Sequence, residues 1–513
     1  MPIRSLAKTF SAEIEGVDAK LIEVEVDINA GVHSFNIVGL ADKSLNEARE
    51  RVNAALKNSG IKPPNRENRK ITVNLAPADL KKNGSHYDLA ITLGYLLATQ
   101  QIGSFDPSDK IFLGELALDG RLRSVNGALS IAQMASRRGF RKIFLPPQNA
   151  NEAAAIENIE IVPVRDLHEA ISALEEKKLI LPFKFIPLEN NGGAYPDISE
   201  IKGQEHAKRA LTIAAAGGHN ILMIGSPGVG KSIISQAIGG ILPDMSREEA
   251  IETTKIWSAS GMSPGGLMRN RPFRAPHQTS SQTALIGGGS DPKPGEISLA
   301  HCGVLFLDEV PEFQKSTLEA LRQPMESGTI NISRAKRSVT LPARFMLVAA
   351  MNPCPCGYYG DPEHECRCTP REVILYQKKI SGPFLDRIDL QIKVKKVGLP
   401  ELRSTEKKGS GSDEIKKCVS NARELQRDRF RKIFPGEKVF TNADLAARQI
   451  EKISNVDRSG EEFLGALGAT RLSPRGYFRM LKVARTIADL DNNDFITAEH
   501  LAEAFSYRLR EEL

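Results

Sequence analysis

The chain reads Gly225-Ser226-Pro227-Gly228-Val229-Gly230-Lys231-Ser232 directly after the apolar run Ile221-Leu222-Met223-Ile224. The apolar run predicts a buried strand, and the apolar residues after Ser232 predict a helix. Glycines let backbone N–H groups curl round phosphate oxygens, Lys231 can reach the β- and γ-phosphates, and the Ser232 hydroxyl can bind Mg²⁺. Because a strand precedes the loop and a helix follows it, we expect residues 225–232 to bind the phosphates of ATP and not to form a simple glycine turn.

The composition is that of a large globular protein. Its 513 residues are too many for one core and predict about three domains. Hydrophobic residues make up 41% of the chain and charged residues 26%, which is enough apolar material for several cores. Lys and Arg exceed Asp and Glu by 69 to 63, a balance that permits a polyanionic partner without requiring one. No signal peptide and no apolar run of membrane-spanning length stand out, so we expect a cytoplasmic protein without a membrane partner.

Apolar periodicity and loop composition divide the chain into segments. Strict alternation in Leu21-Ile22-Glu23-Val24-Glu25-Val26-Asp27-Ile28 predicts a half-buried strand. Further strands are predicted at 71–75, 111–115 and 142–146, and helices at about 44–56 and at 88–97. The expected segments are an N-terminal domain at 1–185, a Pro- and Gly-rich linker at 186–200, an ATPase core at 201–400, a flexible connection at 401–413, and a helical lid at 414–513 with apolar faces such as Val419-Ala422-Leu425.

Two carboxylates follow a second buried strand. The run Gly303-Val304-Leu305-Phe306-Leu307 ends at Asp308 and Glu309. Beyond a phosphate loop this is a Walker B element, in which Asp308 would hold Mg²⁺, mostly through water, and Glu309 would polarise the attacking water. The plainer alternative is an acidic turn after a core strand, and the phosphate loop upstream disfavours it.

Motifs on both sides of this pair resemble those of AAA+ ATPases. Residues 197–211 resemble the opening of their nucleotide domain, where the turn Ile201-Lys202-Gly203-Gln204 lies beside the adenine, so Gln204 joins the expected nucleotide-binding residues. The strand-like run 345–351 ends at Asn352, the position and residue type of sensor 1. Leu472-Ser473-Pro474-Arg475-Gly476 resembles sensor 2, which implies that Arg475 approaches the γ-phosphate from a helical lid.

The segment Gly382-Pro383-Phe384-Leu385-Asp386-Arg387-Ile388-Asp389-Leu390 resembles the F-L-D-R-[FI]-D segment of Mg-chelatase and MCM-type subunits. The resemblance implies that Arg387 is an arginine finger, which neutralises charge on the phosphoryl group of a neighbouring subunit's ATP. The alternative is a surface arginine paired with Asp386 or Asp389. An arginine finger makes one subunit depend on another, and a ring, expected to be a hexamer, follows. The expected catalytic residues are Lys231, Asp308, Glu309, Asn352, Arg387 and Arg475.

The N-terminal segment resembles a different family. Leu113-Gly114-Glu115-Leu116-Ala117-Leu118-Asp119-Gly120-Arg121-Leu122-Arg123 is similar to the G-E-x-x-L-x-G-x-[LVI]-R segment of Lon-protease-like domains. The protease serine and lysine correspond here to His86 and Leu129, so a nucleophile and its base are both missing. A displaced pair of Ser85 with Lys81 or Lys82 is the alternative, but a shift of one residue turns a side chain away from its partner. We expect a non-proteolytic α+β scaffold or ring-forming domain.

The remaining core motifs closely resemble the Mg-chelatase-like family. They are residues 269–281, Gly287-Gly288-Gly289 and residues 294–301, and with the Lon-like segment the whole chain resembles the YifB/ComM branch of that family. The resemblance implies an α/β multidomain fold: an N-terminal Lon-protease-like α+β domain, a P-loop AAA+ α/β core with a helix-2 insert and a hairpin before sensor 1, and a C-terminal helical lid. It also implies a hexameric helicase that promotes branch migration while single-stranded DNA is integrated in natural transformation or homologous recombination. Single-stranded and branched DNA, with recombination proteins, are the implied partners.

A short basic segment supports a polyanionic partner independently. Arg334-Ala335-Lys336-Arg337 lies between two strand-like runs just before sensor 1, and in this family such a hairpin points into the ring channel. Three cations at a hairpin tip suit phosphate contacts, which do not read sequence. The alternative is a solvated turn. Three further cations, Arg269, Arg271 and Arg274, are a second predicted DNA-binding set, and some of them could instead brace subunit interfaces.

Four of the six cysteines lie in one short segment. Cys354-Pro355-Cys356 and Cys366-Arg367-Cys368 would close a compact loop, and four thiolates can form a tetrahedral structural Zn²⁺ site. His364 is a substitute ligand if one cysteine is excluded. The alternative is a set of free thiols kept reduced in the cytoplasm.

These motifs together predict an ATP- and Mg²⁺-dependent DNA motor. A protein remodeller or a metal-chelatase-like chaperone is the main alternative, suggested by the Lon-like segment and the chelatase resemblance. A nucleotide-gated scaffold without enzymatic activity is a third interpretation, which the full set of hydrolytic groups disfavours.

Overall fold

The computed structural model describes residues 6–508 with gaps at 40–44, 46, 67, 189–194, 290–292, 335–336, 399, 402–409 and 468–472, and leaves out the side chains of Ser333, Arg334 and Arg337. By the contacts among its residues the chain forms two compact units. The first unit contains Met1–Glu189 and Arg247–Arg269, and the second contains Asn190–Ser246 and Asn270–Leu513.

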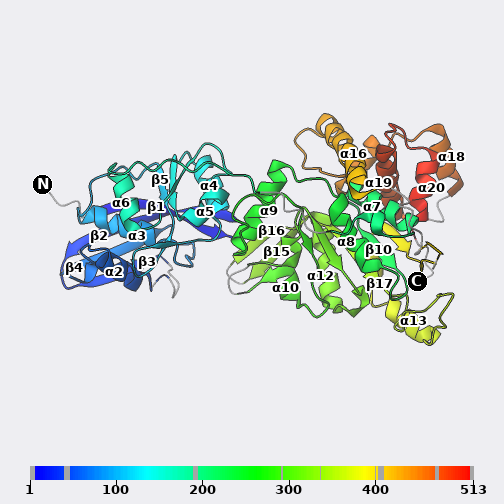
Figure 1. Cartoon of the computed structure of the whole chain (residues 1–513), viewed down its shortest axis with the longest axis horizontal. Helices are drawn as coiled ribbons and strands as arrows, with labels where there is room; N and C mark the ends of the chain where they lie inside the picture. The colour runs from blue at the N-terminus through cyan, green and yellow to red at the C-terminus, as the bar shows by residue number, and fades with distance from the viewer. Residues whose placement is uncertain are drawn as a thin grey trace. The chain divides into compact units, whose positions relative to one another are not determined.

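The first unit contains a mixed four-stranded sheet in the order β1-β2-β4-β3 (Figure 1). The predicted strand at 21–28 is confirmed within β2, where Ile22, Val24 and Val26 are buried and the residues between them are not. Helix α3 packs on this sheet so closely that a Cβ at Gly94 would lie 2.8 Å from Val26 Cγ2. The elements are β1 (Leu6–Glu15), β2 (Asp18–Ala30), β3 (Ser34–Val38), α2 (Ala48–Asn58), β4 (Arg69–Ala76) and α3 (Asp88–Ala98).

A small parallel sheet, ordered β5-β8-β9, completes this part of the first unit together with three described helices. The strand predicted at 111–115 ends earlier, at Phe112, because Gly114 has a φ of 152° and Glu115 begins a separate hairpin with Arg123. Two apolar clusters form the core beneath the two sheets. The elements are β5 (Lys110–Phe112), β6 (Glu115–Leu116), β7 (Leu122–Arg123), α4 (Ala128–Arg137), β8 (Lys142–Leu145), α5 (Pro147–Ala153), β9 (Glu160–Pro163) and α6 (Leu167–Leu174).

One helix of the first unit comes from later in the chain. Helix α9 (Arg247–Ala259) packs against α4, although the sequence prediction placed it in the ATPase core at 201–400. The Gly127 N–H donates to the Ser258 hydroxyl at 2.9 Å, and the Lys255 ammonium pairs with Asp18 at 2.6 Å. Periodicity shows that such a helix has an apolar face, but not which of two cores covers that face.

Ser85 has a carboxylate as its partner in the first unit. Its hydroxyl donates to Glu115, while the buried Lys82 ammonium donates to the Pro77 carbonyl oxygen. A serine nucleophile needs a base that can accept its proton, and Glu115 is in turn paired with Arg123 at 3.0 Å. These contacts favour the expected non-proteolytic domain, whose likeness to Lon-protease-like domains stays a prediction.

The second unit is built on a parallel five-stranded sheet in the order β11-β14-β17-β10-β18, of which Figure 1 labels β10 and β17. Strands β10 and β14 are buried and apolar from end to end, as expected where helices cover both faces. Parallel strands end at the same edge, so the loops after β10, β14 and β17 meet there. The strands are β10 (Ile221–Ile224), β11 (Phe273–Arg274), β14 (Val304–Leu307), β17 (Met346–Met351) and β18 (Leu390–Lys393).

Helices and two short ribbons surround this sheet. The predicted hairpin before sensor 1 is confirmed in its backbone, where β15 (Thr329–Arg334) pairs antiparallel with β16 (Arg337–Pro342) and Arg334 lies opposite Arg337. Lys336, at its tip, lies outside the described residues. The other elements are α7 (Glu205–Gly217), α8 (Lys231–Ile241), α10 (Gln282–Ile286), β12 (Gly287–Gly288), β13 (Lys293–Pro294), α11 (Glu296–Leu299), α12 (Lys315–Ser327), α13 (Pro370–Gln377) and α14 (Gly382–Leu385).

The C-terminal part of the second unit is helical, as predicted. Val419 and Ala422 are buried on the first of these helices, whereas Leu425, predicted on the same apolar face, is 39% exposed. The helices share one continuous apolar core with the parallel sheet. They are α16 (Ser412–Ile433), α17 (Ala447–Ile453), α18 (Arg458–Leu467), α19 (Pro474–Leu490) and α20 (Ala498–Ser506).

A buried carboxylate joins these helices to the sheet. Asp389, which directly precedes β18, is 4% exposed and accepts a hydrogen bond from Arg479 of α19 at 2.5 Å. The Asn220 N–H donates to its other oxygen at 3.1 Å. Burial would raise the pKa of Asp389, but Arg479 and His219 hold it below its usual value, so the pair stays ionised.

We expect Asp389→Ala to lower the free energy of unfolding by about 3 kcal/mol, because it leaves the partly buried Arg479 charge and the Asn220 N–H without their common carboxylate. Urea denaturation followed by circular dichroism measures this. Glu462→Ala is the matched control, since it breaks the exposed pair of Arg458 and Glu462 and should change the stability by less than about 0.5 kcal/mol. Equal effects of the two variants would contradict the structural role of Asp389.

Candidate active site

The phosphate loop lies between β10 and α8, as the sequence predicts. Gly228 and Gly230 have φ values of 78° and 91°, a left-handed conformation that side chains disfavour, and this lets the loop curl before the helix begins. The Lys231 ammonium donates to the carbonyl oxygens of Gly225 and Ser226 at 2.7 and 2.9 Å, and to Asn352 Oδ1 at 3.0 Å. The lysine is therefore held within the curve of the loop, with its charge at the N-terminal end of α8, where anions are favoured.

The environment of Lys231 suits an anionic ligand. Burial lowers the pKa of Lys231, and the carboxylates of Asp308 and Glu309 offset part of this effect. A buried cation whose pKa is lowered gains from a nearby negative charge. A phosphate oxygen is such a charge, so phosphate binding would stabilise the ammonium form.

Two oxygen ligands for a divalent cation lie next to each other. The Ser232 hydroxyl, in the first turn of α8, donates to Asp308 Oδ2 at 2.8 Å, at the end of β14. Mg²⁺ prefers oxygen ligands and binds through one or two protein groups together with water and phosphate. The donor set of Ser232 and Asp308 therefore fits a Mg²⁺ ion that accompanies bound ATP.

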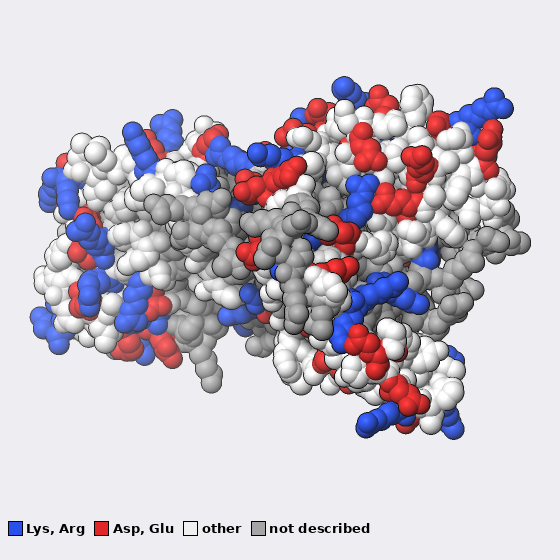
Figure 2. Space-filling view, turned by 45° about the vertical axis from the view of Figure 1, so that its right-hand side comes forward, with Lys and Arg blue, Asp and Glu red and all other residues white. Residues whose placement is uncertain are grey.

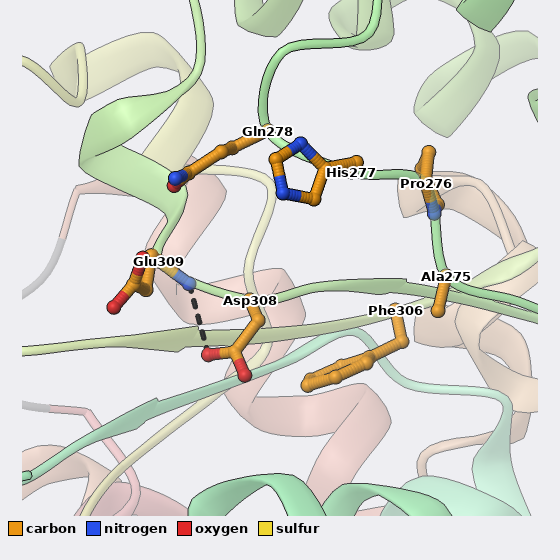
Figure 3. A pocket seen from close by; sticks show the side chains of 7 residues that line it. All are labelled: Ala275, Pro276, His277, Gln278, Phe306, Asp308 and Glu309. Carbon is orange, nitrogen blue, oxygen red and sulfur yellow. Dashed lines mark hydrogen bonds between the residues drawn. The ribbon is translucent and has the colours of Figure 1, made fainter.

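Glu309 adopts a strained backbone conformation at the mouth of a pocket. Its φ is 49°, and its N–H donates to Asp308 Oδ1 at 2.9 Å. Such strain clusters at functional sites. Glu309 and Asp308 line a pocket of about 240 Å³, the other lining residues being Phe306 and the segment 275–278 (Figure 3).

His277 and Gln278 form the opposite wall of this pocket, and sequence reasoning missed them as site residues. Figure 3 shows both side chains across the pocket from Asp308 and Glu309. They lie there because β11 and β14 pair in parallel, so the residues after Arg274 run beside those after Leu305. Among the described residues, Gln278 Oε1 is buried without a hydrogen-bond partner, so Gln278 is a candidate to orient water or phosphate in the pocket.

Two other predicted nucleotide residues lie on neighbouring loops. Asn352 follows β17 and accepts a hydrogen bond from Lys231, which places it beside the phosphate loop; its role in orienting the attacking water stays a prediction. Gln204 has a left-handed φ of 60° and donates from its side chain to the Lys395 carbonyl oxygen, after β18. The role of Gln204 beside the adenine stays a prediction.

Arg387, the predicted arginine finger, is buried in its own subunit. Its exposed fraction is 7%, and its guanidinium donates to the Pro383 carbonyl oxygen and to Glu326, both at 2.5 Å. Neither Asp386 nor Asp389, the partners considered from sequence, supplies these contacts. To reach the ATP of another subunit, Arg387 would have to break them. Arg475, the predicted sensor 2 residue, is exposed in the first turn of α19.

The second predicted DNA-binding set has partners within the chain. Arg274 forms a two-point pair with Glu296 at 2.6 and 2.7 Å. Arg271 donates to the carbonyl oxygens of Pro243 and Cys302, each at 2.7 Å, and Arg269 donates to that of Leu188 at 3.3 Å. These contacts favour a structural role for Arg269, Arg271 and Arg274, and their DNA binding stays a prediction.

The four-cysteine loop, residues 354–368, has the geometry of a metal site. The sulfur atoms of Cys354, Cys356, Cys366 and Cys368 lie within 4.8 Å of one another, and Cys354 Sγ is 3.7 Å from Cys366 Sγ. Zinc–sulfur bonds of about 2.3 Å in a tetrahedron place the sulfurs about 3.8 Å apart. The four cysteines are the possible metal ligands of this cluster, and His364 is not among them. The His364 ring is stacked on Tyr358, and its Nδ1 lies 3.5 Å from Asp361 Oδ1. The donor set therefore fits Zn²⁺.

Comparison with protein families gives three matches in chain order. The family described as subunit ChlI of Mg-chelatase matches residues 24–149. That described as magnesium chelatase, subunit ChlI, matches 197–402, and its C-terminal family matches 409–508. The second match spans the phosphate loop, the paired carboxylates and the cysteine loop.

Whole-length relatives are found among bacterial proteins. The chain is 43% identical to competence protein ComM of Haemophilus influenzae over 510 residues, which cover 98% of this chain and 97% of the relative. It is 45% identical to the uncharacterised protein YifB of Escherichia coli over 495 residues, 96% of this chain and 95% of the relative. A shorter match, 27% over 222 residues, links 40% of this chain to 25% of the DNA replication licensing factor mcm7 of Schizosaccharomyces pombe. In the described part of the chain no helix combines the length and apolarity needed to cross a bilayer.

We expect Glu309→Gln to bind ATP with unchanged affinity and to hydrolyse it at least about 100-fold more slowly, because the amide cannot accept the proton of the attacking water. Affinity is measured with a fluorescent ATP analogue, and turnover by phosphate release. Lys231→Ala is the control variant, and it should lose ATP binding as well as hydrolysis. If Glu309→Gln hydrolyses ATP at the wild-type rate, Glu309 is not the residue that activates the attacking water.

Purified without chelator, the protein should carry about one zinc per chain, and Cys366→Ser should lose it. Elemental analysis measures the metal content. Cys418→Ser, which changes an exposed cysteine outside the cluster, should leave the zinc content unchanged. Substantially less than one zinc per wild-type chain would reject the site.

Proposed function

The chain belongs to the magnesium chelatase ChlI family of AAA+ ATPases and is a homologue of YifB and ComM over nearly its whole length, and from this premise we propose that it is an ATP-driven DNA motor. In the proposal it acts as a helicase that promotes branch migration when single-stranded DNA is integrated. The relative named competence protein supports a role in natural transformation or homologous recombination.

Hydrolysis would use the residues that meet at the strand ends. Lys231 binds the β- and γ-phosphates, while Ser232 and Asp308 are the residues that would hold Mg²⁺, which supplies charge neutralisation at the phosphates. Glu309 accepts the proton of the attacking water, and Asn352 orients that water. Gln278 faces the same pocket and is a further polar group for this positioning.

A ring, expected to be a hexamer, is the proposed working form. A neighbour would supply positive charge to the site, as arginine fingers do in related ATPases. For Arg387 this requires release from Glu326 on assembly, whereas the exposed Arg475 is free to act from the helical part of its own subunit. The ring number and the source of the arginine stay proposals.

The observation that carries the DNA assignment is the basic hairpin of β15 and β16. Its two six-residue strands bring Arg334 opposite Arg337, and the chain between them contains Lys336. The hairpin lies in sequence between the Walker B carboxylates and Asn352, which gives hydrolysis a short path to its tip. Figure 2 shows positive and negative side chains interspersed over the face it draws, so the positive charge that suits DNA is this local cluster and not a broad basic surface.

A protein remodeller or metal-chelatase-like chaperone is the second candidate, favoured by the chelatase family to which the chain belongs. Peptide-threading pores present an aromatic-hydrophobic pair of residues to the channel. The cations Arg334, Lys336 and Arg337 suit a polyphosphate backbone better.

We expect the wild-type protein to displace a strand from a forked or three-stranded DNA with ATP, and DNA to stimulate its ATP hydrolysis. Replacing Arg334, Lys336 and Arg337 with alanine should abolish both DNA effects and keep basal hydrolysis, because phosphate contacts with DNA are separate from the nucleotide site. The salt slope of single-stranded DNA binding should fall by about 2, from three lost contacts at about 0.7 each.

The matched control replaces three cations of α16, Arg427, Arg431 and Lys432, and should leave DNA coupling intact. If the wild type neither unwinds DNA nor is stimulated by it, the motor assignment fails and protein remodelling becomes the better candidate. Equal loss of basal and DNA-stimulated hydrolysis in the hairpin variant would contradict the role of the hairpin.

A further inference from the structure

The cysteine loop, residues 354–368, contacts the phosphate loop through a hydrogen bond. Asp361 Oδ2 accepts a hydrogen bond from the Ser226 hydroxyl at 2.6 Å, and the Asp361 side chain is only 5% exposed. Ser226 is the second residue of the phosphate loop and its carbonyl oxygen also accepts from Lys231. A carboxylate on one loop therefore fixes the side chain of a residue that shapes the other.

A second contact is steric. Gly357 is buried with a φ of 87°, and a Cβ built on it would lie 2.6 Å from Pro227 Cδ, closer than side-chain carbons approach. The backbone of the cysteine loop thus packs directly on Pro227. Since Ser226 and Pro227 are neighbours, the two contacts together support the start of the phosphate loop.

The conformation of the cysteine loop depends on its sulfur cluster. Residues 352–369 contain no helix or strand, so no backbone ladder holds them. Gly357 directly follows Cys356, and the Tyr359 N–H donates to Cys354 Sγ at 3.3 Å. The Asp361 N–H donates to the Tyr358 carbonyl oxygen at 3.1 Å, which ties Asp361 to this sulfur-bound turn. Where metal ligands hold a loop without secondary structure, metal binding contributes directly to folding of the loop.

Asp361 is presented in one orientation. Its Oδ1 accepts from the N–H groups of Glu363 and His364 at 2.9 and 3.0 Å, which leaves Oδ2 for Ser226. These donors also offset the repulsion that a carboxylate so near a phosphate site would cause. The carboxylate is thus aimed at the phosphate loop by the fold of the cysteine loop.

We propose that the four-cysteine loop is a metal-dependent brace on the phosphate loop, with Asp361 as the positioning residue that couples metal binding to nucleotide binding. The inference rests on the zinc site and the ATP site described above, and not on the DNA assignment. With the brace in place, the N–H groups of the phosphate loop are held in the geometry that phosphates require, so less ordering is needed on binding. Loss of the brace should change nucleotide affinity and not the chemical step, because Asp361 contacts the phosphate loop and not the reacting groups.

Coupling of this kind is reciprocal. If zinc raises the affinity for nucleotide by some factor, nucleotide must raise the affinity for zinc by the same factor. A loop that only stabilises the fold would leave both factors at one in a folded protein, so a shared factor above one is the result that separates the two roles.

The first test uses the full-length, zinc-loaded protein. Asp361→Ala should weaken binding of a fluorescent ATP analogue about tenfold, the usual effect of losing a hydrogen bond to a charged group, while the zinc content stays unchanged. Glu363→Ala is the control, since it removes a charge from the same loop whose partner is Lys396. Ser226→Ala combined with Asp361→Ala should weaken binding no more than the stronger single variant, because both remove one contact.

The second test measures both directions of the coupling. Removal of zinc by a chelator should weaken nucleotide binding, and a non-hydrolysable ATP analogue should protect zinc from the chelator by the same factor. Asp361→Ala should bring both factors close to one.

Unchanged nucleotide affinity after zinc removal would overturn the proposal, as would tighter nucleotide binding by Asp361→Ala, which would mean that charge repulsion dominates. If the metal-free protein loses its circular dichroism signal, the zinc-loaded Asp361→Ala variant decides: affinity equal to that of Glu363→Ala rejects the brace. These measurements use no DNA, so failure of the motor assignment does not affect them.

Discussion

The hydrogen bonds of the Lys231 ammonium hold the nucleotide site together. They join the first residues of the phosphate loop to Asn352, and so connect the end of β10 to the end of β17. The Ser232 hydroxyl adds the end of β14 through Asp308. Because these strands are parallel neighbours, their ends meet without any long connection having to fold back. Hydrolysis at this edge depends on that arrangement, since groups from three separate segments must act on one phosphate.

Two of the parts that distinguish this ATPase leave from the same edge. Segment 275–278 faces Glu309 because β11 runs parallel to β14, and the cysteine loop begins two residues after Asn352 and returns to Ser226. The basic hairpin precedes β17 and therefore joins the opposite end of that strand from Asn352. Of these parts, the cysteine loop has the direct contact with the phosphate loop.

Local motifs could be predicted, and the partners of single charges could not. The phosphate loop, the paired carboxylates and the four cysteines each carry their chemistry within a few residues, so spacing alone indicated what they can bind. Arg387 and Arg274 looked available for phosphates, yet Glu326 and Glu296 pair with them inside the chain. The sequence does not show which group an arginine will pair with. Its side chain is long and flexible, so it can reach any carboxylate or carbonyl oxygen that the fold brings near.

The sequence by itself determined the order of strands and loops, the nucleotide chemistry, and the cysteine spacing that suits zinc. The tertiary structure decided that Gln278 faces Glu309, that Asp361 supports Ser226, and that α9 packs in the first unit. The physical reason is the range of the interactions. Motifs record contacts among neighbours in the chain, whereas strand register and loop packing join residues separated by many positions, and only the folded backbone sets those distances.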